Sequence, residues 1–217
     1  MNKKIAIDIV KKLKEKYPDA KCSLDFTTPF EMLVAVSLSA QCTDERVNKV
    51  TPALFKRCTC LEDYISIPIY ELEDLVHSCG FYRNKAKNIQ QAATDVLEIF
   101  DGVVPNNHKD LTKLAGVGRK SANVIMLEAF GIASGIAVDT HAKRISNLMG
   151  LSKFKEPDKI EKDLLKIFPR EHLKDINHLL VWHGRNTCVA RKPKCDFCPV
   201  HIYCSNYIKR IKHDKRK

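Results

Sequence analysis

The sequence predicts an all-α protein, and three observations lead to that fold class. Apolar residues recur at helical spacing along most of the chain. No segment shows the strict apolar–polar alternation that is typical of a half-buried strand. The intervening segments are short, without an internal repeat or a low-complexity linker before the basic C-terminal residues. At 217 residues, of which 44% are hydrophobic, the chain is long enough to bury a substantial core.

The first predicted helix carries Ile5, Ile9, Leu13 and Tyr17, which recur every four residues. This spacing places all four side chains on one face, where they can pack against the rest of the protein. Pro18 should end the helix, because proline has no backbone N–H to donate within a helix.

The second predicted helix begins at a capping signal. Thr28 is the expected N-cap, Pro29 the first helical residue, and Glu31 the partner that completes a capping box. A buried helix should follow as far as about Gln41, and Thr43 should cap a third helix. The remaining helices are expected at 70–78 (closed by Gly80), 86–96, 110–114, 119–130, 140–148, 158–168 and 171–182, which makes about ten in all.

The net charge of +11 is concentrated at the two ends of the chain. Residues 205–217 carry six Lys or Arg against Asp214 alone, and residues 1–21 carry seven lysines against three acids. Such a field favours a polyanionic partner, although a basic surface that only aids solubility would look the same. No run approaches the roughly 18 apolar residues of a membrane span, and residues 1–10 lack the apolar block of a signal peptide. We therefore expect a cytoplasmic protein with no membrane partner.

The nine cysteines fall into two groups. Their odd number and scattered placement argue against a disulfide framework. Five are expected to be small buried or half-buried side chains without a role: Cys22, Cys42, Cys58, Cys60 and Cys79. The other four lie within 17 residues, which indicates a metal or cluster site: Cys188, Cys195, Cys198 and Cys204.

The spacing of those four cysteines is C-x6-C-x2-C-x5-C. Four thiolates can bind zinc or a four-iron cluster, and the spacing alone leaves both open, although zinc folds usually show two C-x2-C pairs. The loop between the first two carries three positive charges, including Arg191 and Lys192. Ligation would hold these charges in a fixed shape against a phosphate backbone, with the C-terminal tail as a less ordered addition.

Residues 111–125 have the pattern of a helix-hairpin-helix motif. Gly116 and Gly118 allow a tight turn, and a second helix starts near Arg119 with its N–H groups facing outward. Such an N-terminus can cradle a phosphate. An ordinary helix–loop–helix corner is the alternative, but the apolar Leu114 and Val117 favour the hairpin.

Five motifs together resemble the endonuclease III family of the helix-hairpin-helix DNA glycosylase superfamily, and the resemblance covers nearly the whole chain. They are Ser-Ala-Gln-Cys-Thr-Asp at 39–44, Gly-Phe-Tyr-Arg-Asn-Lys-Ala-Lys-Asn-Ile at 80–89, Gly-Val-Gly-Arg-Lys-Ser-Ala-Asn-Val at 116–124, Ile-Ala-Val-Asp-Thr-His at 136–141 and His-Gly-Arg-Asn-Thr-Cys at 183–188. The resemblance implies a DNA N-glycosylase that is also a lyase at abasic sites.

The resemblance implies that Lys120 is the nucleophile and Asp139 its acidic partner. An amine can attack the C1' carbon of the sugar, displace the damaged base and hold the opened sugar as a Schiff base. Loss of a C2' proton then expels the 3' phosphate by β-elimination. Because only the uncharged amine attacks, we expect Lys120 to be buried beside the positive end of a helix. Asp139 should stabilise positive charge on the sugar and assist proton transfer.

The implied partner is double-stranded DNA with an oxidised pyrimidine or an abasic site. Gln41 and Phe81 match the positions that fill the gap left by the extruded nucleotide, although the family more often has leucine at the latter. Ala115 also departs from the family, which commonly has proline there, and should loosen the turn. Further DNA contacts are expected from Gly116, Val117, Gly118, Arg119, His141, Arg144, Arg191 and Lys192.

The resemblance also implies one 4Fe-4S cluster per chain, bound by Cys188, Cys195, Cys198 and Cys204 in a C-terminal cluster loop. It implies two helical domains with a cleft between them: 22–132, ending in the hairpin, and 1–21 with 133–217, carrying the cluster. A monomer associated with the nucleoid is expected. Residues 35–41 contain no carboxylate, which argues against the branch that excises adenine opposite oxidised guanine.

Two other functions remain compatible with these patterns. A non-catalytic helical DNA-binding protein whose cluster senses iron or oxidants would account for the charge, the hairpin and the cysteines. It would leave Lys120 and Asp139 without a role. A monofunctional glycosylase that uses water as its nucleophile is the second. Covalent trapping by borohydride distinguishes both from the lysine-dependent enzyme.

Overall fold

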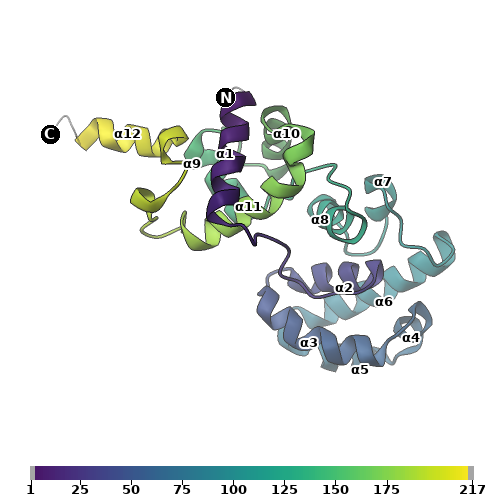
Figure 1. Cartoon of the computed structure of the whole chain (residues 1–217). Coiled ribbons are helices and arrows are strands. Elements are labelled where there is room, and N and C mark those ends of the chain that lie inside the picture. Colours follow the sequence, from purple (N-terminus) through teal and green to yellow (C-terminus); the bar gives the residue numbers. More distant parts are fainter. Residues whose placement is uncertain (1–2, 215–217) are drawn as a thin grey trace. The chain divides into compact units, whose positions relative to one another are not determined.

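The computed structural model describes residues 3–214, with side chains as far as residue 212 (Figure 1). Twelve α-helices and four short 3-10 helices make up the regular structure of these residues, and they contain no strand. The prediction of an all-α protein is confirmed. The chain divides into two compact units, Ser23–Ile132 and Met1–Cys22 with Ala133–Lys217. No helix in the described part of the chain combines the length and apolar character that crossing a bilayer requires.

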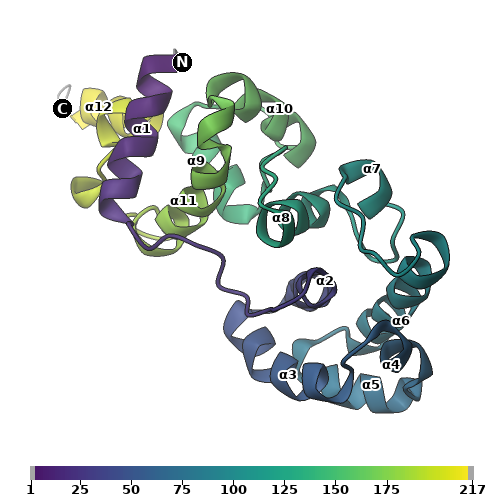
Figure 2. The same ribbon diagram turned by 45° about the vertical axis from the view of Figure 1, so that its right-hand side comes forward.

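The unit Ser23–Ile132 is built around the apolar helix α2 (Pro29–Ser39). Figure 2 looks along α2, with α3, α6 and α8 around it. Because α2 is enclosed by these neighbours, seven of its residues are buried. The other elements of the unit are α3 (Asp44–Arg57), α4 (Leu61–Ser66), α5 (Ile69–Val76), η1 (His77–Cys79), α6 (Tyr82–Ile99), α7 (His108–Leu111) and α8 (Arg119–Phe130).

The predicted start of α2 is confirmed atom by atom. The Thr28 Oγ1 accepts a hydrogen bond from the Glu31 N–H at 3.1 Å, and the Glu31 carboxylate accepts from the Thr28 N–H at 3.2 Å. Pro29 occupies the first helical position. The cap on α3 is also confirmed, because the Thr43 Oγ1 accepts from the Arg46 N–H.

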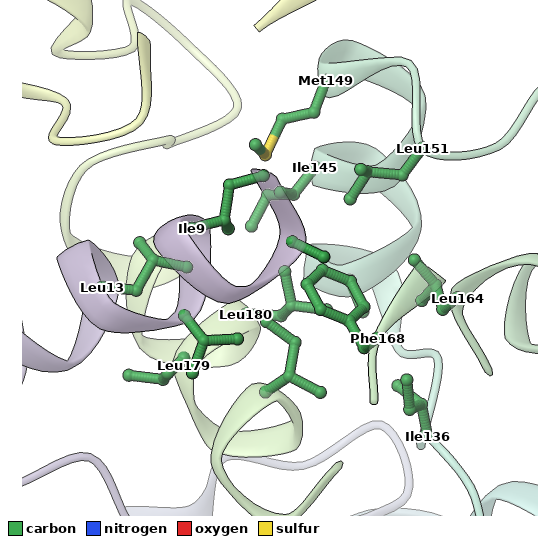
Figure 3. Packing of buried hydrophobic residues seen from close by; sticks show 14 of the residues in the cluster. Ile9, Leu13, Ile136, Ile145, Met149, Leu151, Leu164, Phe168, Leu179 and Leu180 are labelled. Carbon is green, nitrogen blue, oxygen red and sulfur yellow. The ribbon is translucent and has the colours of Figure 1, made fainter. Parts of the chain in front are cut away.

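The second unit gathers its core from both ends of the chain. It contains α1 (Lys3–Lys16), α9 (Thr140–Met149), α10 (Pro157–Ile167), η2 (Arg170–His172), α11 (Leu173–Asn186), η3 (Cys195–Phe197), η4 (His201–Tyr203) and α12 (Ser205–Asp214). Figure 3 shows Ile9 and Leu13 of α1 packed beside Ile145 of α9 and Leu180 of α11. Each fully buried aliphatic side chain contributes about 2 kcal/mol, so α1 is an integral part of this core.

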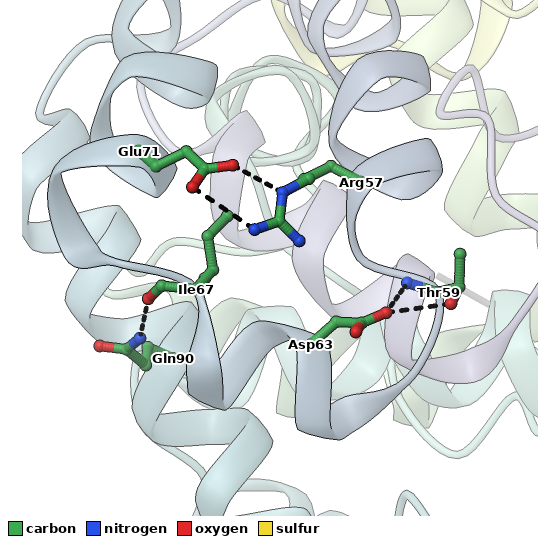
Figure 4. Close-up of polar contacts among 6 residues, drawn as sticks. All are labelled: Arg57, Thr59, Asp63, Ile67, Glu71 and Gln90. Atoms are coloured by element: carbon green, nitrogen blue, oxygen red, sulfur yellow. Dashed lines mark hydrogen bonds and ion pairs between the residues drawn. The ribbon is translucent and has the colours of Figure 1, made fainter.

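Two helices of the structure were not predicted from the sequence. The helix α4 was not predicted, because its N-cap is Cys60 in place of the usual Ser, Thr, Asp or Asn. Its ends are held by other side chains, as Figure 4 shows: Asp63 accepts from the Thr59 N–H at 2.7 Å, and Gln90 Nε2 donates to the Ile67 carbonyl at 3.0 Å. No helix was predicted in the C-terminal tail, which forms α12 as far as Asp214.

Candidate functional site

The predicted hairpin is present, with α7, a tight turn and α8 in succession. Asn107 caps α7 by accepting from the Asp110 N–H, and Leu111 anchors the helix in the core. Gly116 has a φ of 76°, in the left-handed region that glycine tolerates best. Gly118 is the N-cap of α8 and offers no side-chain acceptor to the first turn of that helix. The positive end of α8 is therefore not capped from within its own sequence.

The turn of the hairpin is held against α6. A Cβ at Gly116 would lie 3.0 Å from Asn88 Nδ2, so a larger residue there would require Asn88 of α6 to shift. The Ala115 N–H donates to Asp95 Oδ2 of α6 at 3.2 Å. Proline, the usual family residue at this position, has no N–H and could not make that bond. The bond to Asp95 therefore tethers the turn that the loss of proline was expected to loosen.

The predicted hairpin contacts differ in how they can reach a ligand. Gly116, Gly118 and Arg119 are exposed, whereas the Val117 side chain is buried. Val117 can therefore meet a ligand only through its backbone. Lys120 is the second residue of α8 and is exposed. The expected helix N-terminus is present beside Lys120, but the expected burial of its side chain is not observed.

Asp139 is the N-cap of α9 in the other unit. Its Oδ1 accepts from the Ala142 N–H at 2.7 Å, which fixes the orientation of the half-buried carboxylate. The preceding backbone is anchored by two buried polar side chains: the Ala137 N–H donates to Asn177 Oδ1, and the Ile136 N–H donates to Glu161 Oε1. The backbone that leads to Asp139 is therefore held in place by hydrogen bonds to buried side chains.

Gln41 and Phe81, the two predicted gap-filling residues, line the same pocket of about 250 Å³ in the unit Ser23–Ile132. Gln41 follows the end of α2, and Phe81 is the N-cap of α6. Phe81 is 65% exposed, so it is not a core residue. Both adopt left-handed backbone conformations, with φ of 53° and 48°. Such strain in residues other than glycine is concentrated at functional sites.

His141 and Arg144, both predicted to contact DNA, lie together on α9. The Arg144 guanidinium donates to the carbonyls of Gly184 and Cys188 at 2.9 and 2.7 Å, and lies 3.2 Å from His141 Nδ1. His141 packs tightly on Gly184, where a Cβ would lie 2.7 Å from the His141 Cβ. The Nε and Nη2 groups of Arg144 thus fix the backbone at Cys188.

The four predicted cysteine ligands line one cavity: Cys188, Cys195, Cys198 and Cys204. Burial raises the pKa of the Cys198 thiol to about 11, so a thiolate there needs a cation beside it. No group of three or more His, Cys, Asp or Glu side chains within residues 3–212 is arranged to hold a single metal ion. The four sulfurs share a cavity and are the donor type that iron–sulfur clusters use, so the set fits a cluster.

The loop between the first two cysteines keeps its positive side chains outside. Arg191 and Lys192 are exposed, and Lys192 has a left-handed φ of 53°. The Lys194 N–H donates to the Thr187 carbonyl at 3.0 Å, which ties the end of the loop to the end of α11. The loop can therefore present its charges outward from the cavity.

Sequence reasoning missed three buried polar residues that support these groups: Lys85, Glu161 and Asn177. Lys85 and Asn177 interrupt otherwise buried faces of α6 and α11, and Glu161 does the same in α10. A polar residue at a position of the apolar stripe is the signal that could have identified them, because buried polar groups need specific partners.

Comparisons with known proteins agree with this arrangement. Residues 34–170 match the HhH-GPD superfamily of base excision DNA repair proteins. An endonuclease III of Synechocystis sp. is 50% identical over 93% of this chain and 92% of its own length. A solved structure of a non-covalent endonuclease III–DNA complex is 41% identical, with a TM-score of 0.90 over 98% of this chain and 99% of the other.

A second solved structure, of a trapped endonuclease III–DNA covalent intermediate, is 42% identical. Its TM-score is 0.90 over 97% of this chain and 99% of the other. The family match covers more than half of the chain, and the full-length relatives exceed 30% identity. The chain belongs to the HhH-GPD superfamily of base excision DNA repair proteins and, within it, to the endonuclease III family of DNA glycosylases and AP lyases.

Proposed function

We propose that this DNA glycosylase and AP lyase removes oxidised pyrimidines from duplex DNA through a Schiff base on Lys120. The observation that carries the proposal is the position of Lys120, directly after the glycine turn and within the uncapped first turn of α8. There the free backbone N–H groups attract the phosphates of the substrate. The trapped covalent intermediate of a relative 42% identical to this chain supports a covalent route.

In the proposed reaction the Lys120 Nζ lone pair attacks C1' of the damaged nucleotide. The bond from C1' to the base breaks, and the base leaves with the electron pair and takes up a proton. The C1'–O4' bond then breaks and O4' takes up a proton from the amine nitrogen, so that the opened sugar is an imine of Lys120, which withdraws electrons from C2'. Loss of a C2' proton converts the imine to an enamine. The enamine expels the 3' phosphate as the C3'–O bond breaks, which leaves a C2'–C3' double bond conjugated with the restored imine. Water then releases the sugar fragment and restores the amine.

Asp139 supplies the negative charge in this proposal. Its carboxylate stabilises the positive charge that develops on the sugar as the base leaves, and then assists proton transfer. The hydrogen bond from the Ala142 N–H keeps the carboxylate in one orientation, so little reorganisation is needed during the reaction.

The proposed DNA contacts have separate tasks. The backbone of Gly116, Val117 and Gly118 binds phosphate, while Gln41 and Phe81 fill the space left by the extruded nucleotide. The remaining contacts come from charged or polar side chains: Arg119, His141, Arg144, Arg191 and Lys192. Because the proposed substrate is chromosomal DNA, the place of action that we propose is the cytoplasm, at the nucleoid, and the protein would act as a monomer.

We further propose that Cys188, Cys195, Cys198 and Cys204 hold a 4Fe-4S cluster. The four sulfurs line one cavity, and only one C-x2-C pair is present where zinc folds usually show two, which favours a cluster over zinc. Bound there, the cluster would supply a rigid cross-link within this unit. The loop at 189–194 would present Arg191 and Lys192 to DNA. Arg144 fixes the backbone at Cys188.

The proposal is tested with duplexes that contain thymine glycol, an abasic site or adenine opposite 8-oxoguanine, with and without borohydride. We expect trapping with the first two and none with the third, and Lys120→Ala should abolish trapping. Lys56→Ala, which removes an exposed lysine of α3, is the matched control and should trap normally. Base release without trapping would indicate the monofunctional enzyme. Binding without base release would indicate the non-catalytic DNA-binding protein.

A further inference from the structure

Lys85 is a buried lysine whose ammonium joins the two segments that lead to Gln41 and Phe81. It is 6% exposed, although lysine is among the residue types that are rarely buried. Its Nζ donates to the Leu38 carbonyl at 2.8 Å and to the Cys79 carbonyl at 2.9 Å. One side chain of α6 therefore connects the end of α2 with the end of η1.

Both acceptors lie two or three residues before a proposed gap-filling residue. Leu38 is in the last turn of α2, three residues before Gln41, and Cys79 ends η1, two residues before Phe81. The final carbonyls of a helix have no partner within the helix and carry partial negative charge. An ammonium satisfies them more strongly than a neutral donor would. Lys85 thus holds the end of α2 and the end of η1 at a fixed distance from each other.

Each of the two segments that Lys85 joins leads to a residue with a strained backbone. Gln41 and Phe81 have left-handed backbones, a conformation that is unfavourable in a residue other than glycine and persists only where the surroundings impose it. Burial of the ammonium is also unfavourable, and this desolvation lowers the pKa of Lys85, opposed by the thiols of Cys42 and Cys79. An apolar residue at this position would avoid the desolvation penalty. We therefore attribute the presence of the ammonium to its hydrogen bonds with the two carbonyls.

The same face of α6 also reaches the hairpin. Phe81, Lys85 and Asn88 follow one another at helical spacing, and Asn88 is the residue that packs on Gly116. One pocket is lined by all of these groups together with Gln41 and Ser121, the neighbour of Lys120. The gap-filling residues and the phosphate-binding turn are consequently positioned by a single helix.

We propose that Lys85 is a positioning residue that holds Gln41 and Phe81 in register, so that both can fill the duplex when a nucleotide is extruded. The inference rests on the proposed function, because it assumes the gap-filling role of these two residues. It goes beyond that function by assigning a buried residue that need not touch DNA. Lys85 should matter for a paired lesion, which must be extruded, and much less for an unpaired lesion, which is already accessible.

The test is the ratio of two single-turnover excision rates, measured on thymine glycol paired with adenine and on the same lesion in single-stranded DNA. The full chain is used with its cofactor bound. Lys85→Met keeps the length of the side chain and removes the donor, and should lower the ratio about tenfold, because small misplacements of positioned groups cost one to two orders of magnitude in rate. Loss of stability alone lowers both rates together and leaves the ratio unchanged.

Two variants complete the experiment. Lys85→Arg retains donors for both carbonyls and should restore most of the ratio. Lys87→Met makes the same change at an exposed lysine of α6 and should leave the ratio at the wild-type value. Should the Lys85→Met protein not fold, Lys85→Gln replaces it, since its shorter amide cannot reach both carbonyls.

The outcomes separate the two proposals. A wild-type ratio in the methionine or glutamine variant overturns the positioning role and leaves the proposed function intact. Absence of excision by the wild-type protein on both substrates overturns the proposed function and the inference with it. A lowered ratio that arginine restores supports both.

Discussion

Asn88 of α6 packs against Gly116 so closely that a Cβ at residue 116 would lie within 3.0–3.2 Å of three atoms of its side chain. The turn of the hairpin has therefore been shaped by its neighbour in the fold as well as by its own two glycines. This contact links the turn that we propose to bind phosphate to the helix that carries Phe81 and Lys85.

Gly116→Ala should weaken both folding and DNA binding. The new Cβ would meet Asn88 and would have to adopt a φ of 76°, so we expect a loss of about 1–3 kcal/mol in the free energy of unfolding. Gly118→Ala is the matched control, because a Cβ there meets nothing within 4 Å and its φ is −88°. Urea denaturation measures both variants. Equal stability of the two would contradict the proposed close contact.

The capping role of Asp139 and its proposed chemical role can be separated by substitution. Asp139→Asn keeps an oxygen that can accept from the Ala142 N–H but removes the charge, so stability should change little while base excision falls about 10²- to 10⁴-fold. Asp139→Ala should lose the same activity and, in addition, about 1 kcal/mol of stability. Thermal unfolding and single-turnover kinetics test the pair. Full activity in the asparagine variant would remove the carboxylate from the mechanism.

Phe81→Ala should slow excision of a paired lesion without destabilising the protein. The ring is 65% exposed, so its removal leaves no cavity in the core. Stopped-flow fluorescence with 2-aminopurine next to the lesion reports on extrusion directly, and we expect a smaller and slower signal. Phe81→Leu, which restores the common family residue, should recover most of it. If the alanine variant unfolds markedly more easily, Phe81 is a packing residue instead.

Loss of one cysteine ligand should affect one unit of the chain more than the other. Cys198→Ser should lower the iron content and the visible absorbance of the purified protein, and loosen α12 and the loop at 189–194. The unit Ser23–Ile132 contains none of the four cysteines and should keep its hydrogen-exchange protection. Unchanged iron content, or zinc in its place, would refute the cluster assignment.

The sequence predicted most helices because their signals are local. The capping box at Thr28 and the glycine turn before Arg119 each fix a boundary through neighbouring residues, and α8 has the predicted bounds. The start of α4 is held by Asp63, and its end by Gln90, which lies on another helix. The six residues of α4 alone were therefore not enough to predict the helix. The roles of Lys85 and Asn177 depend in the same way on carbonyls and N–H groups brought together by folding.

The most direct test of the central claim is the identity of the amine that bonds to DNA. The borohydride-reduced complex with an abasic-site duplex is digested with protease and nuclease, and the adduct is located by tandem mass spectrometry. We expect the sugar remnant on the Lys120 Nζ and on no other amine in stoichiometric amount. An adduct on the N-terminal amine or on a different lysine, in a protein that remains fully active, would contradict the assignment of Lys120 as nucleophile.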